Sequence, residues 1–289
     1  MITHPFTYQA PATIEEAVQQ LGKGDDAKVI AGGHSLLPLM KLGLAQPETL
    51  IDLRHIASLH QIRTEADGTI VIGALATHRD IAHDKTVRAK LAALADAAGE
   101  VGDLQVRARG TIGGSLAHAD SAADEPAPTL AYDATIRAIG PAGRRDIAAR
   151  DYFKGTFETA LAANEIIAEI RFPAPAGRTG GAYAKFAHPA SGFAVTGVAA
   201  VVTIKSDGTV ERAAIGVAGV AAAAYRATEA ERALTGTKAD AKAIVEAAAK
   251  AANGITALSD LAASAEYRKH LVTVYAKRAI ERAIQRARA

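Results

Sequence analysis

Short apolar runs alternate with polar residues along the chain, and their spacing changes several times between helix-like and strand-like. Near the N-terminus, Thr13 and Glu16 form a capping-box pattern, and apolar side chains then recur at helical spacing as far as Leu21. A helix is therefore expected over residues 14–22.

The next apolar run is Val29-Ile30-Ala31, which ends at a pair of glycines. This pattern predicts a strand that leads directly into a tight turn. A short apolar helix is expected from Leu36 to Met40, and a second strand over residues 49–53. Together these elements predict a small α/β unit that is complete by about residue 56.

From residue 57 the pattern is mixed. A strand is predicted over residues 69–72, and a capped helix start at Thr77 is followed by helical spacing through Leu94. Residues 103–124 have weak periodicity and many glycines, so a long irregular loop is expected there. Long ordered loops are uncommon unless they serve a function.

The rest of the chain predicts three more strands, a linker and a C-terminal region of hairpin and helices. The strands are expected over residues 134–139, 145–148 and 165–172, the linker over 173–177, the hairpin over 193–204 and 210–220, and the helices over 226–235, 239–252 and 265–287. The two prolines of the linker cannot continue a strand, and Asp207-Gly208 is a favoured hairpin turn. The expected fold class is α+β, with domains 1–56, 57–177 and 178–289.

Composition narrows the function classes. No stretch approaches the roughly 20 apolar residues of a membrane span, and residues 1–5 do not resemble a secretory signal, so a soluble cytoplasmic protein is expected. The 289 residues include no cysteine, which excludes disulfides, thiolate zinc sites and cysteine-ligated iron–sulfur clusters in this chain. A redox role therefore requires an organic cofactor.

The charge balance gives no reason to expect nucleic acid as a partner. Lys and Arg number 33 and Asp and Glu number 31. Basic residues are concentrated only in residues 277–288, which we interpret as a solvated helix face, with binding of RNA or anionic lipid as the alternative.

Ala31-Gly32-Gly33-His34-Ser35 follows the first predicted strand and is the first candidate binding segment. Adjacent glycines allow successive main-chain N–H groups to turn toward one point, which suits the pyrophosphate of a dinucleotide. The Ser35 hydroxyl adds a donor without charge. The alternative is a glycine turn that only reverses the chain.

A second segment, Thr111-Ile112-Gly113-Gly114-Ser115, repeats this chemistry. Neither segment continues as G-x-G-x-x-G, which argues against a Rossmann site and for a long ligand such as FAD, held from two sides. His34 and His118 lie in or beside these segments, where each is either a donor to the ligand or is satisfied by loop backbone.

Together these strings resemble a known family. Residues 31–38 and 111–120, with Asp52-Leu53-Arg54 between them, look like the FAD-binding medium subunit of carbon monoxide dehydrogenase, in the xanthine dehydrogenase group of molybdenum hydroxylases. The resemblance extends to residues 151–153, 170–173 and 266–268. It implies a two-lobed FAD-binding domain of the vanillyl-alcohol-oxidase/PCMH type, followed by a C-terminal antiparallel sheet plus helical bundle.

The resemblance also implies cofactor-binding positions and no catalytic side chain. The implied positions are Val29, Ile30, Ala31, Gly32, Gly33, His34, Ser35 and Leu36 on one side, Thr111, Ile112, Gly113, Gly114 and Ser115 on the other, and Val101, His118, Asp124, Ile167 and Lys185 around the rings. Val101 replaces an aromatic residue of some relatives. Phe193 stands where carbon monoxide dehydrogenases are expected to carry tyrosine, so the substrate stays open among carbon monoxide, an N-heterocycle and an aldehyde.

In such a complex, electrons pass from a molybdenum-cofactor large subunit through an iron–sulfur small subunit to FAD on this chain, and then to a quinone, oxygen or NAD. A dimer of heterotrimers is expected. The alternatives are a stand-alone FAD oxidase with its own substrate pocket and a non-catalytic interaction protein.

Two other chemistries are disfavoured by the residues. Residues 113–117 approach the G-x-S-x-G nucleophile elbow, but no apolar strand precedes Ser115 and the last glycine is alanine. His55 with His60, and His78 with His83, are five residues apart and face away from each other on a helix, so no metal site is expected.

Overall fold

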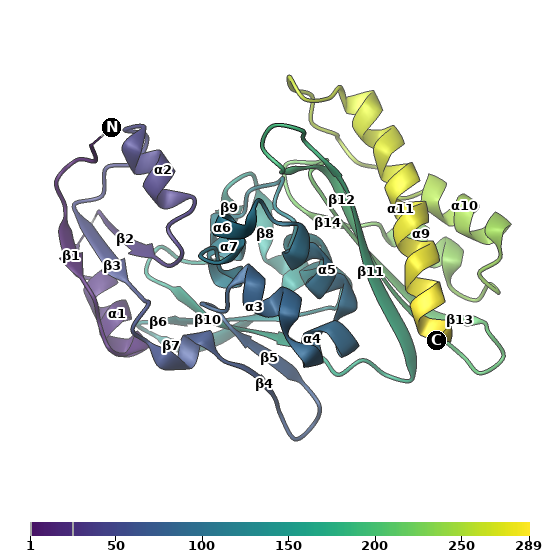
Figure 1. Ribbon diagram of the computed structural model, residues 1–289, viewed down its shortest axis with the longest axis horizontal. Coiled ribbons are helices and arrows are strands. Elements are labelled where there is room, and N and C mark those ends of the chain that lie inside the picture. Colours follow the sequence, from purple (N-terminus) through teal and green to yellow (C-terminus); the bar gives the residue numbers. More distant parts are fainter. Residues whose placement is uncertain (1, 25) are drawn as a thin grey trace.

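A computed structural model describes residues 2–24 and 26–289; Met1 of the N-terminal stretch considered above lies outside the described residues. Three groups of elements follow one another along the chain and lie side by side, with the N-terminal lobe at the left of Figure 1, the middle lobe at the centre and the C-terminal domain at the right. The fold class is α+β, as expected.

The N-terminal lobe is a three-stranded parallel sheet in the order β1-β3-β2, with two helices. Its elements are β1 (Thr7–Gln9), α1 (Ile14–Leu21), β2 (Ala27–Ile30), α2 (Leu36–Lys41) and β3 (Thr49–Asp52). Helix α1 begins where the capping pattern predicts, because the Thr13 side chain accepts a hydrogen bond from the N–H of Glu16. Strand β1 was not predicted, because its side chains are mostly exposed and form no apolar pattern.

The middle lobe is a five-stranded antiparallel sheet in the order β4-β5-β10-β6-β7, covered by short helices. Its strands are β4 (Ile62–Thr64), β5 (Ile70–Gly73), β6 (Thr135–Gly140), β7 (Gly143–Ala148) and β10 (Ile166–Phe172), and β8 (Phe153–Gly155) and β9 (Glu158–Thr159) form a separate hairpin. Its helices are α3 (His78–His83), α4 (Lys85–Lys90), α5 (Ala92–Glu100), α6 (Leu104–Arg107), α7 (Ile112–His118) and α8 (Pro126–Ala131).

The C-terminal domain is an antiparallel sheet with helices on its outer face. The elements are β11 (Arg178–Ala187), β12 (Ala194–Ile204), β13 (Val210–Ala218), β14 (Tyr225–Arg226), α9 (Thr228–Leu234), α10 (Ala241–Ala249) and α11 (Ala265–Arg288). Helix α11 lies along one face of the sheet, and α5 and α8 of the middle lobe pack against the other (Figure 1). Every residue of β12 is buried as a result, which explains its unbroken run of apolar and small residues.

Three expectations were wrong. Residues 103–124 are not one irregular loop, because they contain α6 and α7. The helical spacing after Thr77 belongs to three short helices, which are separated at Asp84 and Leu91. The basic tail is not only a solvated face: a guanidinium nitrogen of Arg286 lies 2.7 Å from a carboxylate oxygen of Asp96 on α5, and Arg282 approaches the same carboxylate.

Strand β11 was not predicted. Five of its ten residues are glycine or alanine, including a glycine pair, so the strand lacks the apolar–polar alternation of a half-buried strand. The reason lies in the packing, since helix α11 contacts the main chain of β11 at Gly180. A Cβ atom at Gly180 would overlap the carbonyl oxygen of Ala283 and approach within 2.9 Å of the carbonyl carbon of Arg286.

We predict that Gly180→Ala lowers the free energy of unfolding by about 1–3 kcal/mol, because α11 must move off the sheet to admit one methyl group. Gly99→Ala is the matched control, since Gly99 is an exposed position of α5 where a Cβ would lie 3.9 Å from the nearest atom, and this substitution should stabilise slightly. Urea unfolding of both variants measures the difference. Equal midpoints for the two would contradict this account of the interface.

Candidate functional site

The first glycine segment connects β2 to α2 as the sequence predicts. Gly33 has φ +77°, a left-handed conformation that favours glycine. The Gly33 carbonyl accepts a hydrogen bond from the N–H of Leu37, which starts α2. The imidazole Nδ1 of His34 lies 2.9 Å from the carbonyl oxygen of Gly32, so this histidine is satisfied by loop backbone.

The main-chain N–H groups of this segment are available. Across the described residues, 2–24 and 26–289, the N–H groups of Gly32, Gly33, His34 and Ser35 donate no hydrogen bond. None of the four residues is buried. Four consecutive free donors at a glycine turn form a site that suits an anionic group such as a phosphate.

The second glycine segment is not a turn, which corrects the expectation. Thr111 is the N-cap of α7, and its hydroxyl oxygen accepts a hydrogen bond from the N–H of Gly114 at 3.1 Å. The N–H groups of Ile112 and Gly113 donate to the carbonyl oxygens of Ala76 and Ala74. The main-chain donors of residues 112–114 are therefore already used within the protein.

The glycines of α7 serve close packing instead. A Cβ atom at Gly113 would lie 2.5 Å from the Cβ of Ala74, beyond the end of β5. A Cβ at Gly114 would lie 4.0 Å from that of Ala31, on the first segment. The small residues thus allow α7 to lie against both the middle-lobe sheet and the first glycine segment.

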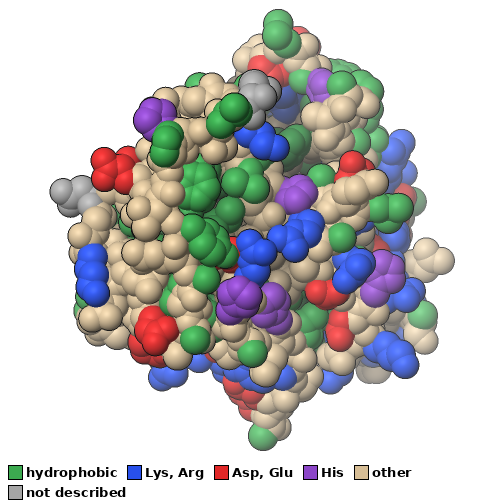
Figure 2. Space-filling model, turned by 60° about the vertical axis from the view of Figure 1, so that its left-hand side comes forward, with side chains coloured by type: hydrophobic (Ala, Val, Ile, Leu, Met, Phe, Trp, Pro, Cys, Tyr) green, Lys and Arg blue, Asp and Glu red, His purple; other side chains and the backbone are tan. Residues whose placement is uncertain are grey.

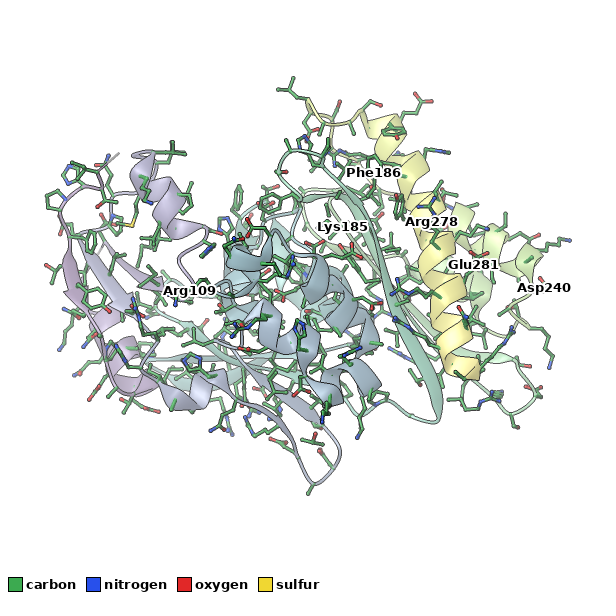
Figure 3. All side chains as sticks on the ribbon, in the orientation of Figure 1. Arg109, Lys185, Phe186, Asp240, Arg278 and Glu281 are labelled. Atoms are coloured by element: carbon green, nitrogen blue, oxygen red, sulfur yellow. The ribbon has the colours of Figure 1, made fainter. Side chains whose placement is uncertain are left out.

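The first glycine segment meets the loop directly before the second segment at Gly32. A Cβ atom there would overlap the carbonyl oxygen of Arg109 and lie 2.9 Å from the Cα of Gly110. Main chain therefore packs on main chain between the N-terminal lobe and the loop before α7, and Figure 3 shows Arg109 at this junction. The structure brings together the two segments that the sequence analysis singled out.

Asp124 and Lys185 form a buried pair farther along the site. The Nζ of Lys185 lies 2.9 Å from the Asp124 carboxylate and also donates to the carbonyl oxygen of Glu100, and both side chains are less than 5% exposed. The Tyr183 hydroxyl donates to the same carboxylate at 2.6 Å. Figure 3 shows Lys185 on the part of β11 that faces the middle lobe.

Burial controls the ionisation of this cluster. It raises the pKa of Asp124 from 3.8 to about 6, although the Lys185 charge and the hydrogen bond from Tyr183 act in the opposite direction. Burial and the neighbouring Asp124 carboxylate raise the pKa of Tyr183 well above 10. The hydroxyl of Tyr183 is therefore a permanent donor at neutral pH.

The remaining sequence candidates are spread around these groups. The Val101 carbonyl accepts a hydrogen bond from Arg107, and His118 packs on Phe157 with ring centroids 4.8 Å apart. Ile167 is 4% exposed and lies near the start of β10, within the hydrophobic core. The Phe193 side chain is 49% exposed, just before β12.

A second buried pair was missed by the sequence analysis. The Nδ1 of His78 lies 2.7 Å from a carboxylate oxygen of Glu125, with side chains 6% and 0% exposed. Burial, the largest influence, lowers the pKa of His78, but the charge and hydrogen bond of Glu125 together with Asp124 leave that pKa above 6.5. No local pattern marks this pair, because 47 residues separate its members.

Other chemistries find no support in the described residues. No group of three or more His, Cys, Asp or Glu side chains that could hold a metal ion occurs there. Ser115 lies within α7 and follows the loop and cap at residues 108–111, so the strand required by a nucleophile elbow is missing. Of the helices in the described part of the chain, none combines the length and apolar character needed to cross a bilayer.

The surface around the first glycine segment is mixed. Leu42 and Leu44 after α2 are exposed. Figure 2 brings this side of the molecule forward and shows hydrophobic side chains gathered beside lysine, arginine and histidine side chains. An apolar surface flanked by basic groups is compatible with a ligand that has both rings and phosphates.

Comparison with known families decides the assignment. A family model described as the FAD binding domain in molybdopterin dehydrogenase matches residues 4–175, and one described as the CO dehydrogenase flavoprotein C-terminal domain matches residues 181–283. The chain belongs to the FAD-binding medium chains of the molybdopterin dehydrogenases. Its cofactor is FAD, and it is an oxidoreductase subunit of a multi-subunit complex.

Individual relatives support the same family across the whole chain. The carbon monoxide dehydrogenase medium chain of Hydrogenophaga pseudoflava is 44% identical over 285 residues, which are 98% of each chain. Subunit alpha of the 6-hydroxypseudooxynicotine dehydrogenase complex of Paenarthrobacter nicotinovorans is 36% identical over 284 residues, 98% of this chain and 96% of that one. Both are subunits of larger enzymes, and neither supports the stand-alone oxidase.

A solved structure shows the same fold. The carbon monoxide dehydrogenase of Hydrogenophaga pseudoflava that lacks the Mo-pyranopterin moiety contains a chain that matches with a TM-score of 0.94 and 44% identity, over 99% of both chains. The middle-lobe and C-terminal sheets described above thus belong to the flavoprotein fold expected from the sequence.

We predict that Lys185→Met lowers the free energy of unfolding by about 3 kcal/mol at pH 8, because it leaves a buried carboxylate without its cation. The loss should be smaller at pH 5. The pKa of Asp124 is raised in the folded state, so the stability contributed by the neutral carboxyl is present below about pH 4 and lost as the pH rises through about 6. The variant raises that pKa further, so its loss grows with pH.

Urea unfolding at pH 5 and pH 8 measures this difference, with the exposed Lys205→Met as the matched control. A loss of stability in Lys185→Met that is the same at both pH values would show that Asp124 and Lys185 are not coupled.

Proposed function

We propose that this chain holds the FAD pyrophosphate on residues 32–35, at the junction of the N-terminal and middle lobes. The observation that carries the proposal is the row of four main-chain N–H groups that have no acceptor within the described residues. Glycine at position 32 admits the close approach of the Arg109 main chain, glycine at position 33 adopts the left-handed conformation, and none of residues 32–35 is buried. Val29, Ile30 and Ala31 lead into this row, and Leu36 follows it.

The second segment forms the opposite wall of the site through close packing and not through free N–H donors. Thr111, Ile112, Gly113 and Gly114 bring α7 against Ala31. Roles for the Ser115 hydroxyl and the His118 ring toward the cofactor are proposed from the family pattern. The small size of Gly114 lets α7 approach the first glycine segment closely, because a Cβ atom at Gly114 would already lie 4.0 Å from that of Ala31.

The ring systems of FAD are proposed to lie near Val101, Asp124, Ile167 and Lys185. Support for Asp124 and Lys185 comes from their juxtaposition with Tyr183, which fixes a buried charge pair between the middle lobe and the C-terminal domain. Val101 and Ile167 rest on the family pattern, and Ile167 acts from within the core. We also propose domain boundaries at residues 56 and 177.

In the assembled enzyme we propose that this chain accepts electrons from an iron–sulfur small subunit and passes them to a quinone, oxygen or NAD. Bound FAD supplies the redox chemistry, and the chain supplies position, hydrogen bonds and limited solvent access. A molybdenum-cofactor large subunit oxidises the substrate, in a cytoplasmic dimer of heterotrimers. The lack of cysteine supports this division of labour, because the chain offers no thiolate ligand for a cluster.

We predict that Gly33→Val and Gly114→Val bind FAD at least about tenfold more weakly than wild type. At Gly33 the new side chain meets Leu37 at 2.9 Å and is strained by the positive φ. At Gly114 its Cβ meets the hydroxyl oxygen of Thr111 at 2.9 Å and the Cβ of Ala31 at 4.0 Å, so α7 must shift relative to the first segment. Flavin content and titration with FAD measure the effect. The control is Gly24→Val, whose Cβ would lie 3.9 Å from its nearest neighbour. Full flavin content in both test variants would refute the placement.

We also predict that dithionite bleaches the flavin of the isolated chain reversibly, whereas an oxidisable substrate of the complex does not. Substrate should reduce the flavin only after the partner subunits are added. Absorbance at the flavin bands under anaerobic conditions follows both reactions. Reduction by substrate in the isolated chain would overturn the relay role and favour the stand-alone oxidase.

A further inference from the structure

His78 and Glu125 lie beneath the junction of the glycine segments rather than within it. His78 is the first residue of α3, directly after the N-cap Thr77, and Glu125 directly precedes α8. Neither side chain is a surface group, since both are less than 10% exposed. Two buried titratable groups are costly unless they are paired, so their contact is a strong constraint on both elements.

The His78 ring supports Gly110. The N–H of His78 donates to the carbonyl oxygen of Gly110 at 3.0 Å, and a Cβ atom at Gly110 would lie 2.6 Å from the ring Nε2. Gly110 in turn lies against Gly32, whose Cβ would be 2.9 Å from the Gly110 Cα. A continuous stack therefore runs from Glu125 through the His78 ring and Gly110 to Gly32.

Glu125 also connects the glycine junction to the buried Asp124–Lys185 pair. It is adjacent in sequence to Asp124, which pairs with Lys185 on β11. The two neighbouring carboxylates thus bind different cations, one beneath the glycine junction and one in the C-terminal domain. A shift of the backbone at residues 124–125 moves both contacts together.

We infer that His78 and Glu125 are positioning residues for FAD, which hold Gly110 against Gly32 and so set the geometry of the free N–H groups at residues 32–35. This inference rests on the proposed placement of the pyrophosphate. Neither side chain touches the cofactor in this arrangement, because Gly110 and Gly32 lie between.

The His78–Glu125 pair makes the affinity for FAD depend on pH. The charges that face His78 are Glu125 and Asp124, which favour the imidazolium, and Arg107, which opposes it. Since the pKa of His78 is raised, the charged pair is complete below about pH 6.5 and is lost as the pH rises through the higher folded value. A bound pyrophosphate is anionic and favours the protonated ring, so FAD affinity falls over the same window.

The test measures FAD binding to the apo form of the full chain between pH 6 and pH 9, by flavin fluorescence titration. Wild type should bind FAD more weakly as the pH rises. Glu125→Gln and His78→Gln should bind about tenfold more weakly at pH 6 and should show a flatter pH profile. The matched control is His83→Gln on the same helix, because its exposed ring lies 2.8 Å from the carbonyl oxygen of Arg79 and its loss should leave FAD binding unchanged.

The outcomes separate the two proposals. If wild type takes up no FAD at any pH, the proposed site itself fails. If wild type binds FAD but both variants match it at pH 6, or if the wild-type profile is flat, the positioning role is overturned while the site stands. A variant that fails to fold leaves the decision to the wild-type pH profile, which requires no substitution.

Discussion

The site depends on one contact in which main chain packs directly on main chain. Gly32 lies so close to the Arg109 carbonyl that no side chain fits between them, and this proximity joins the N-terminal lobe to the loop before α7. If the two lobes were separated by even one methyl group, the first glycine segment would lose its support. His78 and Glu125, which lie behind Gly110, matter for the site because they support this contact.

The two glycine pairs look alike in sequence but have different roles, since one exposes N–H donors and the other allows close helix packing. The first occupies a turn with a left-handed residue and leaves its N–H groups unpaired among the described residues. The second lies in the first turn of a capped helix, where the N–H groups are used by Thr111, Ala74 and Ala76. The free N–H donors are thus on the first segment, whereas the second segment contributes close packing of main chain and small side chains.

Local patterns were sufficient for much of the fold. The Thr13 and Thr77 caps, the strand that ends at the first glycine pair and the Asp207-Gly208 hairpin were each predictable, because the residues responsible lie within a few positions of one another. Helix α7 was mistaken for a loop because glycine is a poor helix former, and packing against Ala74 overrides that preference. The pairing of His78 with Glu125 is long-range and left no sequence signal.

The complete burial of β12 has a consequence for how the molecule can be divided. One of its faces packs on α11, while the other shares a single hydrophobic core with the middle lobe, in which Ala199 and Val201 join Ile72 and Leu94. A polypeptide cut at residue 177 would leave apolar surface uncovered on both pieces. The proline-rich linker marks a change of architecture, yet the halves are not interchangeable modules, and recombination between relatives must preserve the packing across that shared core.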